Sequence, residues 1–339
     1  MVRELLRAFA ARDDPHTYRC YARARWQEPL DERFGWELIG ARDPIWHVRT
    51  AAAASRDCDV FLSSNSYLTV PLLRVPAVAI VYDLIAFDRA MQPNRRSAMI
   101  ERVTLGPAVR RARGLVCISQ ATADALLARF PAVSGKVTVA PLGVSPALSA
   151  PADEELSELP AGGFVLAVGT LEPRKNLPRL VAGYSALPRA LQDAHSLVVV
   201  GARGWDTGPT LAALRSLGDR CLLLGHVSDA TLAELYRRCA VFCYPSLGEG
   251  FGLPVLEAMA AGAAVLTSNL SSLPEVGGDA VEYVDPVSVE SIAAGLERLL
   301  ASPQRRAALG ARALERAGKF SWERTAALTL AALERAAGG

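Results

Sequence analysis

The chain has 339 residues, of which 51% are hydrophobic and 21% charged, and its formal net charge is +2 at pH 7. This length suits two α/β domains, and the composition excludes a disordered chain. The near-neutral charge gives no support for a nucleic-acid partner, and no apolar run of about 18 residues predicts a membrane span. The six cysteines lack zinc or redox spacing and the first residues lack a signal-peptide core, so we expect a cytoplasmic protein.

The first half of the chain begins on a helical pattern over residues 1–12, in which Val2, Leu5, Leu6 and Phe9 recur at helical spacing. Short apolar runs then predict strands at 18–22, 59–64, 78–83, 114–119 and 136–141. Helical patterns occupy 97–113 and 121–129. Residues 141–160 are rich in Pro, Gly, Ser and acidic residues, which indicates a linker between two sheets.

The second half alternates strands and helices regularly. Predicted strands lie at 164–170, 196–202, 221–227, 241–246, 264–269 and 281–284. Predicted helices lie at 177–187, 210–217, 230–239 and 254–261, and the chain ends on an Ala- and Leu-rich helix at 322–337. Repeated strand–helix units predict right-handed crossovers and a doubly wound parallel sheet.

One loop with candidate chemistry follows the strand at 164–170. Ligands of parallel sheets bind beyond the carboxyl ends of the strands, near helix N-termini. Here Arg174 and Lys175 precede Asn176, a candidate helix N-cap, and Pro178 lies in the first turn. The positive end of a helix dipole disfavours cations, so an anion bound between Arg174 and Lys175 would remove this unfavourable interaction. Two solvated loop charges are the alternative.

A second loop follows the strand at 241–246. Its glycines let the backbone approach a ligand closely: Gly248, Gly250 and Gly252. We expect Pro254 to be the first residue of the next helix, which leaves free N–H groups aimed at the loop. Glu249 lies in the loop and Glu257 on the expected first turn, and a carboxylate can accept hydrogen bonds from a sugar diol. A surface carboxylate that stabilises the helix dipole is the alternative for Glu257.

Together these segments resemble glycosyltransferase family 4. Members of that family are retaining enzymes with two Rossmann-like domains, an arrangement called GT-B. The family signature is two glutamates separated by seven residues, here Glu249 and Glu257, and the Glu-Pro-Arg-Lys-Asn loop at 172–176 also matches. The resemblance is strong over 160–290 and weaker over 75–145.

The resemblance implies an α/β fold with two Rossmann-like doubly wound parallel-sheet domains that face a central cleft. Residues 1–148 would form the N-terminal acceptor-side domain, and 149–321 the C-terminal nucleotide-sugar-binding domain. The helix at 322–339 would pack back onto the first domain through an apolar stripe that includes Leu330 and Leu333.

Roles follow from the resemblance residue by residue. Arg174 and Lys175 would neutralise the diphosphate as it leaves, because fixed cations stabilise developing negative charge. Glu257 would hold the ribose, and Glu249 the donor sugar. The other donor-binding candidates are Gly250, Phe251, Gly252, Leu253, Thr170, Gly201 and Ser246. No Asp-x-Asp-like metal pair occurs in a suitable loop, so we expect metal-independent catalysis with no cofactor besides the nucleotide diphosphate sugar.

In the first domain, Asp83 ends a strand that would face the cleft. Many relatives carry His-Asp here, whereas this chain has Tyr82 before Asp83. Asp83 would then orient or deprotonate the acceptor hydroxyl, and capping of the following turn is the alternative.

The implied function is retaining transfer of a hexose to a glycan or lipid-linked acceptor, in surface polysaccharide or glycoconjugate synthesis. The loop at 172–176 resembles that of mannosyltransferases, so GDP-mannose is the first expected donor and a UDP-hexose the second. A non-catalytic sugar-nucleotide-binding protein on the same fold is the alternative, because fold alone does not establish catalysis.

Several arginines lie on or beside the helical segment at 97–113: Arg95, Arg96, Arg102, Arg110, Arg111 and Arg113. A solvated helix face is one interpretation. The other is a patch that rests on anionic lipid, which would place the protein at the inner face of the membrane and suit a lipid-linked acceptor.

No strand and no glycine-rich turn precede the helical pattern at 1–12, although a Rossmann-like domain opens with both. We therefore expect the first domain to lack its first strand, through a late start codon or a shortened chain. A variant domain that begins on a helix is the alternative.

Overall fold

The computed structural model describes residues 1–28, 30–64, 66–88, 91, 94–149, 159–160 and 162–338. The chain divides into two compact units. Unit 1 comprises Met1–Phe87, Arg95–Gly143 and Ser321–Gly339, and unit 2 comprises Asp88–Asn94 and Val144–Phe320. Most of the predicted linker, residues 150–158, lies outside the described residues.

Unit 2 contains one parallel sheet in the order β12-β11-β10-β7-β8-β9. Its strands are β7 (Gly163–Val168), β8 (His195–Val200), β9 (Cys221–Gly225), β10 (Val241–Tyr244), β11 (Val265–Ser268) and β12 (Glu282–Val284). All of them were predicted, within two residues at each end. Every residue of β10 and β11 is buried, as expected for parallel strands covered on both faces.

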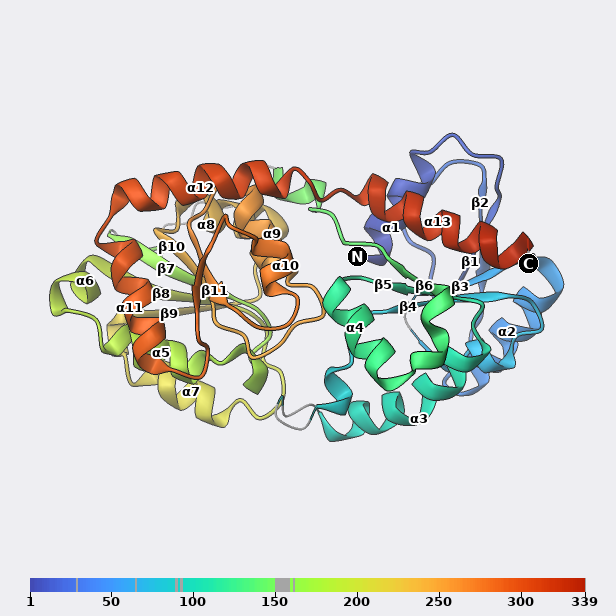
Figure 1. The fold of residues 1–339 in the computed structure, drawn as a ribbon, viewed down its shortest axis with the longest axis horizontal. Helices are drawn as coiled ribbons and strands as arrows, with labels where there is room; N and C mark the ends of the chain where they lie inside the picture. Colours follow the sequence, from blue (N-terminus) through green and yellow to red (C-terminus); the bar gives the residue numbers. More distant parts are fainter. Residues whose placement is uncertain are drawn as a thin grey trace. The chain divides into compact units, whose positions relative to one another are not determined.

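Helices cover both faces of this sheet (Figure 1). On one face α5 contacts α7 and α11, and on the other α9 contacts α8, α10 and α12. The helices of unit 2 are α5 (Leu177–Ser185), α6 (Arg189–Ala194), α7 (Gly208–Arg215), α8 (Asp229–Arg238), α9 (Leu253–Ala260), α10 (Leu273–Gly277), α11 (Val289–Leu300) and α12 (Pro303–Ala317). The sequence patterns missed α6, α10, α11 and α12.

The strand order reverses at the centre of the unit 2 sheet. From β7 the chain moves outward through β8 and β9, and then returns to β10 on the other side of β7. Helices that follow β7 and β10 therefore leave on opposite faces and open a crevice beyond the carboxyl ends of these strands. This switch point is where ligands bind in open parallel sheets.

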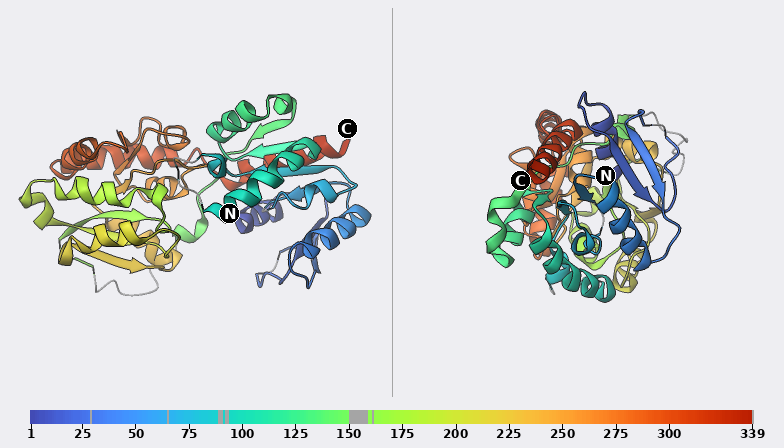
Figure 2. Two further views of the ribbon diagram at one scale, coloured as in Figure 1. Left: turned by 90° about the horizontal axis from the view of Figure 1, so that it is seen from below. Right: turned by 90° about the vertical axis from the view of Figure 1, so that its right-hand side faces the viewer.

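Unit 1 contains a parallel sheet in the order β3-β4-β5-β6 and a separate parallel pair, β1 and β2. The strands are β1 (Tyr18–Ala22), β2 (Phe34–Leu38), β3 (Phe61–Ser63), β4 (Ala77–Val81), β5 (Gly114–Cys117) and β6 (Val137–Val139). Segment 18–22 is a strand, as predicted, but it pairs with the unpredicted β2 outside the larger sheet. The two strands run side by side in the right-hand view of Figure 2.

The helices of unit 1 include the first and last elements of the chain. They are α1 (Val2–Ala10), α2 (Ile45–Asp57), α3 (Arg95–Arg111), α4 (Gln120–Arg129) and α13 (Trp322–Gly338). Helix α13 contacts α1, β4, β5 and β6 (Figure 1), and its side chains Leu330 and Leu333 are buried. Among the described residues no strand precedes α1, and the expectation of a missing first strand stays a prediction.

None of the helices in the described part of the chain is both long and apolar enough to cross a lipid bilayer.

The core of unit 1 is built mainly from small and branched apolar side chains of β4, β5 and α3, including Val81, Leu115 and Leu105.

We expect Leu330→Ala to destabilise unit 1, because this α13 side chain is only 5% exposed. Removal of a buried leucine leaves a cavity and costs about 2–4 kcal/mol of unfolding free energy. Urea unfolding of the variant measures the loss. Leu314→Ala on α12 is the control, since Leu314 is 55% exposed, and we expect a change of at most about 0.5 kcal/mol. Equal effects of the two substitutions would contradict the packing described for α13.

Candidate functional site

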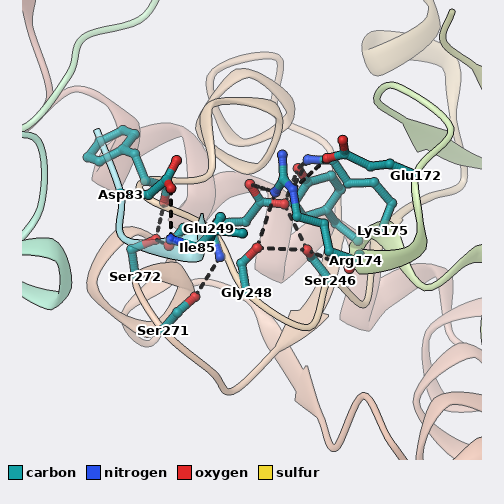
Figure 3. A network of polar contacts seen from close by, with 12 residues as sticks. Asp83, Ile85, Glu172, Arg174, Lys175, Ser246, Gly248, Glu249, Ser271 and Ser272 are labelled. Atoms are coloured by element: carbon teal, nitrogen blue, oxygen red, sulfur yellow. Dashed lines mark hydrogen bonds and ion pairs between the residues drawn. The ribbon is translucent and has the colours of Figure 1, made fainter. Parts of the chain in front are cut away.

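The two predicted loops meet at the switch point of unit 2. They follow β7 and β10, which are neighbours in the sheet, with Val165 aligned to Val241. The backbone N–H of Leu247 donates to the carbonyl of Arg174 at 2.8 Å, and the hydroxyl oxygen of Ser246 lies 3.0 Å from the same carbonyl oxygen. The structure thus brings both loops into one site (Figure 3).

The carboxylate of Glu249 lies at the centre of this site. Its Oε2 pairs with Nη1 of Arg174, and its Oε1 pairs with Nζ of Lys175 at 2.7 Å. The hydroxyls of Ser246 and Tyr244 also donate to Oε1, at 2.7 and 2.8 Å. The side chain of Glu249 is only 8% exposed, so water screens these interactions weakly.

The charges of this cluster stabilise one another. Burial alone would raise the pKa of Glu249, but Lys175 and Arg174 together lower it to about 2. Burial lowers the pKa of Lys175, and the carboxylate of Glu249 opposes that shift. For Arg174 burial also lowers the pKa, but Glu249, Tyr244 and Glu172 together outweigh it, so the pKa of Arg174 is raised. Glu249 and Arg174 are therefore both ionised at neutral pH.

A second carboxylate completes the cluster. Oε1 of Glu172 lies 2.5 Å from Nε of Arg174, and burial raises the pKa of Glu172. From the sequence we predicted that a bound anion would neutralise Arg174 and Lys175 at the start of a helix. In the structure both side chains already contact the carboxylate of Glu249. Both residues lie on the short 3-10 turn η6 (Pro173–Lys175) ahead of α5. With Glu172 and Glu249 ionised, the formal charges of the four side chains sum to zero. An incoming anion must therefore compete with glutamate for these cations.

Asn176 has a different role from the predicted helix cap. Its backbone is left-handed, with φ of 61°, and its side chain makes no capping hydrogen bond. Instead Nδ2 donates to the carbonyls of Pro245 and Pro286, at 3.0 and 2.6 Å. The asparagine therefore ties the loop after β7 to the loop after β10. Its tolerance of the left-handed region explains why this residue type suits the position.

The glycine loop is fixed from the segment before α10. The Ser272 hydroxyl shares its proton between the carbonyls of Glu249 and Phe251, at 3.0 and 2.8 Å, and the Glu249 N–H donates to Ser271 Oγ at 2.9 Å. Gly252 has φ of 101°, a conformation that strains other residues, and directly precedes α9. Leu253 starts that helix, so Pro254 is its second residue rather than the predicted first.

Glu257 lies one residue beyond the first turn of α9, which corrects the predicted position. Its Oε2 accepts a hydrogen bond from the hydroxyl of Tyr236 on α8, at 3.0 Å. Burial raises the pKa of Glu257, and the bond from Tyr236 opposes that shift. A neighbouring hydroxyl therefore orients this carboxylate, in place of the helix-dipole contact that we weighed from the sequence.

Other candidate residues line or flank the same site. Gly169, Lys175, Tyr244 and Pro245 line a small pocket between the two loops. A side chain at Gly201 would place Cβ 2.0 Å from the carbonyl oxygen of Gly169, so only glycine fits there without movement of the backbone. Thr170 is exposed at the strand end, and Gly250, Phe251 and Gly252 are buried in the glycine loop, where Leu253 is half-buried.

Asp83 lies in unit 1, just after β4. Its Oδ1 accepts a hydrogen bond from the backbone N–H of Ile85 at 2.9 Å, which is the turn-capping contact that we considered for this residue.

Among the described residues, no group of three or more His, Cys, Asp and Glu side chains is placed to hold a metal ion.

The sequence patterns did not single out Tyr236, Tyr244 or Ser272. Both tyrosines are buried, and no role was assigned to either from the sequence. Their hydroxyls become functional candidates only through the direction in which they point, and periodicity carries no signal for that.

Comparison of the sequence with known proteins shows the family to which the chain belongs. The sequence profile described as "Glycosyl transferases group 1" matches residues 154–316. Over 299 residues the chain is 33% identical to the O-antigen chain mannosyltransferase B of Escherichia coli, an alignment that covers 84% of this chain and 77% of that protein. The chain belongs to the group 1 glycosyl transferases.

Further relatives and solved structures agree with this assignment. This group 1 glycosyl transferase is 31% identical to the MMP alpha-(1->4)-mannosyltransferase of Mycolicibacterium hassiacum, over 85% of this chain and 73% of that protein. Sucrose-phosphate synthase from Thermosynechococcus elongatus matches its fold with a TM-score of 0.77 at 22% identity, over 98% of this chain and 92% of that chain. WaaG, a glycosyltransferase involved in lipopolysaccharide biosynthesis, matches the fold with a TM-score of 0.72 at 19% identity, over 100% of this chain and 95% of that chain.

The expected family, GT-B fold and enzyme class are thereby confirmed: the protein is a retaining glycosyltransferase with two Rossmann-like domains. The roles that we assign to individual residues of this glycosyltransferase stay predictions.

We expect Glu249→Gln to destabilise this glycosyltransferase by about 3–5 kcal/mol at pH 7, because two buried cations lose their shared carboxylate. The folded-state pKa of about 2 lies below the ordinary value of 4.5, so the ionised carboxylate stabilises the fold above pH 4.5. That stabilisation is lost as the pH falls towards 2. Urea unfolding of both proteins at pH 7 and at several values below 4.5 should show the difference shrinking.

The matched control is Glu297→Gln on the exposed surface of α11, for which we expect at most about 0.5 kcal/mol at pH 7. A Glu249→Gln difference that stayed constant across the acid range would contradict the proposed ion pairs.

Proposed function

We propose that the protein transfers mannose from GDP-mannose to a glycan or lipid-linked acceptor, with retention, in the synthesis of a surface polysaccharide or glycoconjugate. The single observation that carries this proposal is the similarity over 84% of the chain to a mannosyltransferase that acts on the O-antigen chain. A second relative, aligned over 85% of the chain, is also a mannosyltransferase.

The cation cluster supports a diphosphate leaving group. When the bond between the anomeric carbon and the diphosphate oxygen breaks, negative charge grows on the leaving group. In our proposal Arg174 and Lys175 turn from Glu249 towards that charge. Because both cations are largely buried, their interaction with phosphate oxygens is stronger than it would be in water.

The same exchange would give Glu249 its own role. Once its cations are shared with the donor, the carboxylate can accept hydrogen bonds from sugar hydroxyls. The loop backbone at Gly250, Phe251, Gly252 and Leu253 would complete the donor-sugar site, with Ser246, Thr170 and Gly201 as flanking contacts. The fixed glycine loop favours this role, because Ser271 and Ser272 hold its backbone in place.

Glu257 would hold the ribose of the nucleotide, with Tyr236 as the residue that positions it. Asp83 of unit 1 would orient the acceptor hydroxyl or take its proton while the new glycosidic bond forms on the face from which the diphosphate leaves.

A donor screen tests the proposal. We expect GDP-mannose to raise the melting temperature by several degrees at about 100 times its dissociation constant, equivalent to about 2.7 kcal/mol of stabilisation, whereas UDP-glucose should have little effect. Release of GDP in the presence of an oligomannose acceptor should follow, and a chelator should leave the rate within about twofold. Selective stabilisation by a UDP-hexose would refute the proposed donor. Donor binding without transfer would favour the non-catalytic alternative.

The cations should act mainly on turnover. We expect Arg174→Ala and Lys175→Ala each to lower kcat by about 10²-fold or more, because the leaving group loses a fixed positive charge. Steady-state assays with GDP-mannose measure the effect. Arg189→Ala, at the exposed start of α6, is the control and should retain the normal rate. Near-normal kcat in both site variants would show that these charges serve the fold alone.

Tyr236 should act mainly on donor binding. We expect Tyr236→Phe to raise the KM for the donor by up to about tenfold with kcat retained, because loss of one hydrogen bond to a carboxylate costs about 1.5 kcal/mol. Calorimetry with GDP separates binding from turnover. An unchanged affinity would show that Glu257 does not need this partner.

A further inference from the structure

The hydroxyl of Tyr244 lies between two charged partners at the centre of the site. Nζ of Lys175 donates a hydrogen bond to this hydroxyl, which donates its own proton to Oε1 of Glu249 at 2.8 Å. A phenol has one proton to donate and lone pairs that accept, so both bonds are made at once. The tyrosine is only 3% exposed, so water competes weakly for either bond.

The sheet holds this tyrosine, whereas its two partners lie on loops. Tyr244 is the last residue of β10 and is aligned with Thr267 of β11, whose hydroxyl donates to the Tyr244 carbonyl at 2.8 Å. The ring stacks on that of Phe242, with centroids 5.8 Å apart. Side chains on strands are positioned more precisely than side chains on loops. Tyr244 is therefore the fixed point against which Lys175 and Glu249 are placed.

The ring of Tyr244 makes a second contact with the same ammonium group. Nζ of Lys175 lies 4.9 Å from the ring centroid, within the range of cation–π attraction. On another side, a Cβ atom at Gly169 would lie 3.2 Å from Cε of Lys175, so the loop after β7 packs closely on the lysine side chain. These contacts limit the ammonium to small displacements beside the tyrosine.

The hydroxyl can stay with both partners when a donor binds. A lysine ammonium has three donors, so its bond to Tyr244 leaves two for phosphate oxygens. Glu249, once its cation is shared, would keep the hydrogen bonds from Tyr244 and Ser246, and a buried carboxylate is costly without such bonds. A neutral hydroxyl also competes less with phosphate for the ammonium than a second carboxylate would.

We propose that Tyr244 is a positioning residue for sugar transfer, whose hydroxyl holds Lys175 and Glu249 in place while the ammonium passes from the carboxylate to the leaving diphosphate. This inference rests on the proposed role of Lys175 and names a residue on which that role depends. The alternative is that Tyr244 only fills the core beside Phe242, for which the ring alone would suffice.

The groups around the ammonium of Lys175 give this role a pH signature. Burial lowers the pKa of Lys175, Glu249 and Glu172 oppose that shift, and Arg174 adds to it. The hydroxyl of Tyr244 accepts a hydrogen bond from the charged form, so its removal should lower the pKa of Lys175 further. Burial raises the pKa of Tyr244 well above its usual value, so the phenol itself stays protonated over the same range.

Tyr244→Phe in the full chain tests the proposal, because it keeps the ring and removes only the hydroxyl. With GDP-mannose and an oligomannose acceptor, we expect kcat to fall about tenfold or more, as for loss of a hydrogen bond to a charged group. The KM for the donor should stay within about threefold. The alkaline limb of kcat/KM, which reports the free enzyme, should move to lower pH by about half a unit or more.

Tyr184→Phe is the matched control. Tyr184 is also a buried tyrosine of unit 2, and its hydroxyl donates to the carbonyl of His195 at 2.7 Å. We expect this variant to lose about as much stability in urea as Tyr244→Phe, but to keep the normal kcat and the normal alkaline limb. Equal kinetic behaviour of the two variants would show a purely structural role for Tyr244 and overturn the proposal.

A double-mutant cycle with Lys175→Ala separates this inference from the proposed function. Because Tyr244 acts mainly through Lys175, adding Tyr244→Phe to Lys175→Ala should change kcat by less than about threefold. Full multiplication of the two effects would overturn the proposal. So would a normal kcat and an unshifted limb in Tyr244→Phe, and slow turnover of Lys175→Ala would then leave the proposed function intact. A near-normal kcat in Lys175→Ala would refute the role of the lysine and this inference with it.

Discussion

The carboxylate of Glu249 is the interaction on which the site depends. It joins the loop after β7 to the loop after β10 through Arg174 and Lys175, while Ser246 and Tyr244 supply hydroxyl donors. Removal of this group would leave two cations in a largely buried environment, which is far costlier than loss of an exposed pair. The switch point of the sheet brings the loops together, and this carboxylate sets the positions of the charged side chains within it.

A cluster whose formal charges sum to zero would suit a site that receives a diphosphate, as we propose. Buried cations without partners would be costly, and with Glu172 and Glu249 as partners they are kept in place at low cost before any ligand arrives. In the proposed function the diphosphate would replace one set of anionic partners with another. The affinity for the nucleotide would then be a difference between two strong interactions, so we expect small changes around Glu249 to affect donor binding strongly.

Much of unit 2 could be predicted because its strands are short apolar runs, of which the central β10 and β11 are buried on both faces, separated by glycine- and proline-containing loops. Helices α11 and α12 were missed because they follow the last strand, where no strand–helix repeat remained to guide prediction. The structure brings the predicted loop residues together, but their partners could not be predicted: Asn176 clamps two loops and Glu257 is held by Tyr236. Such contacts join residues far apart in the chain, and local sequence patterns carry no record of them.

The two ends of the chain lie in the same unit, and this has a consequence for its biosynthesis. Helix α13 packs on α1, β4 and β5, whereas unit 2 is drawn almost entirely from the uninterrupted stretch Val144–Phe320. On the ribosome unit 2 can therefore complete its core while unit 1, although made first, still lacks α13. Until α13 emerges, the apolar surface under that helix stays uncovered and is open to chaperones.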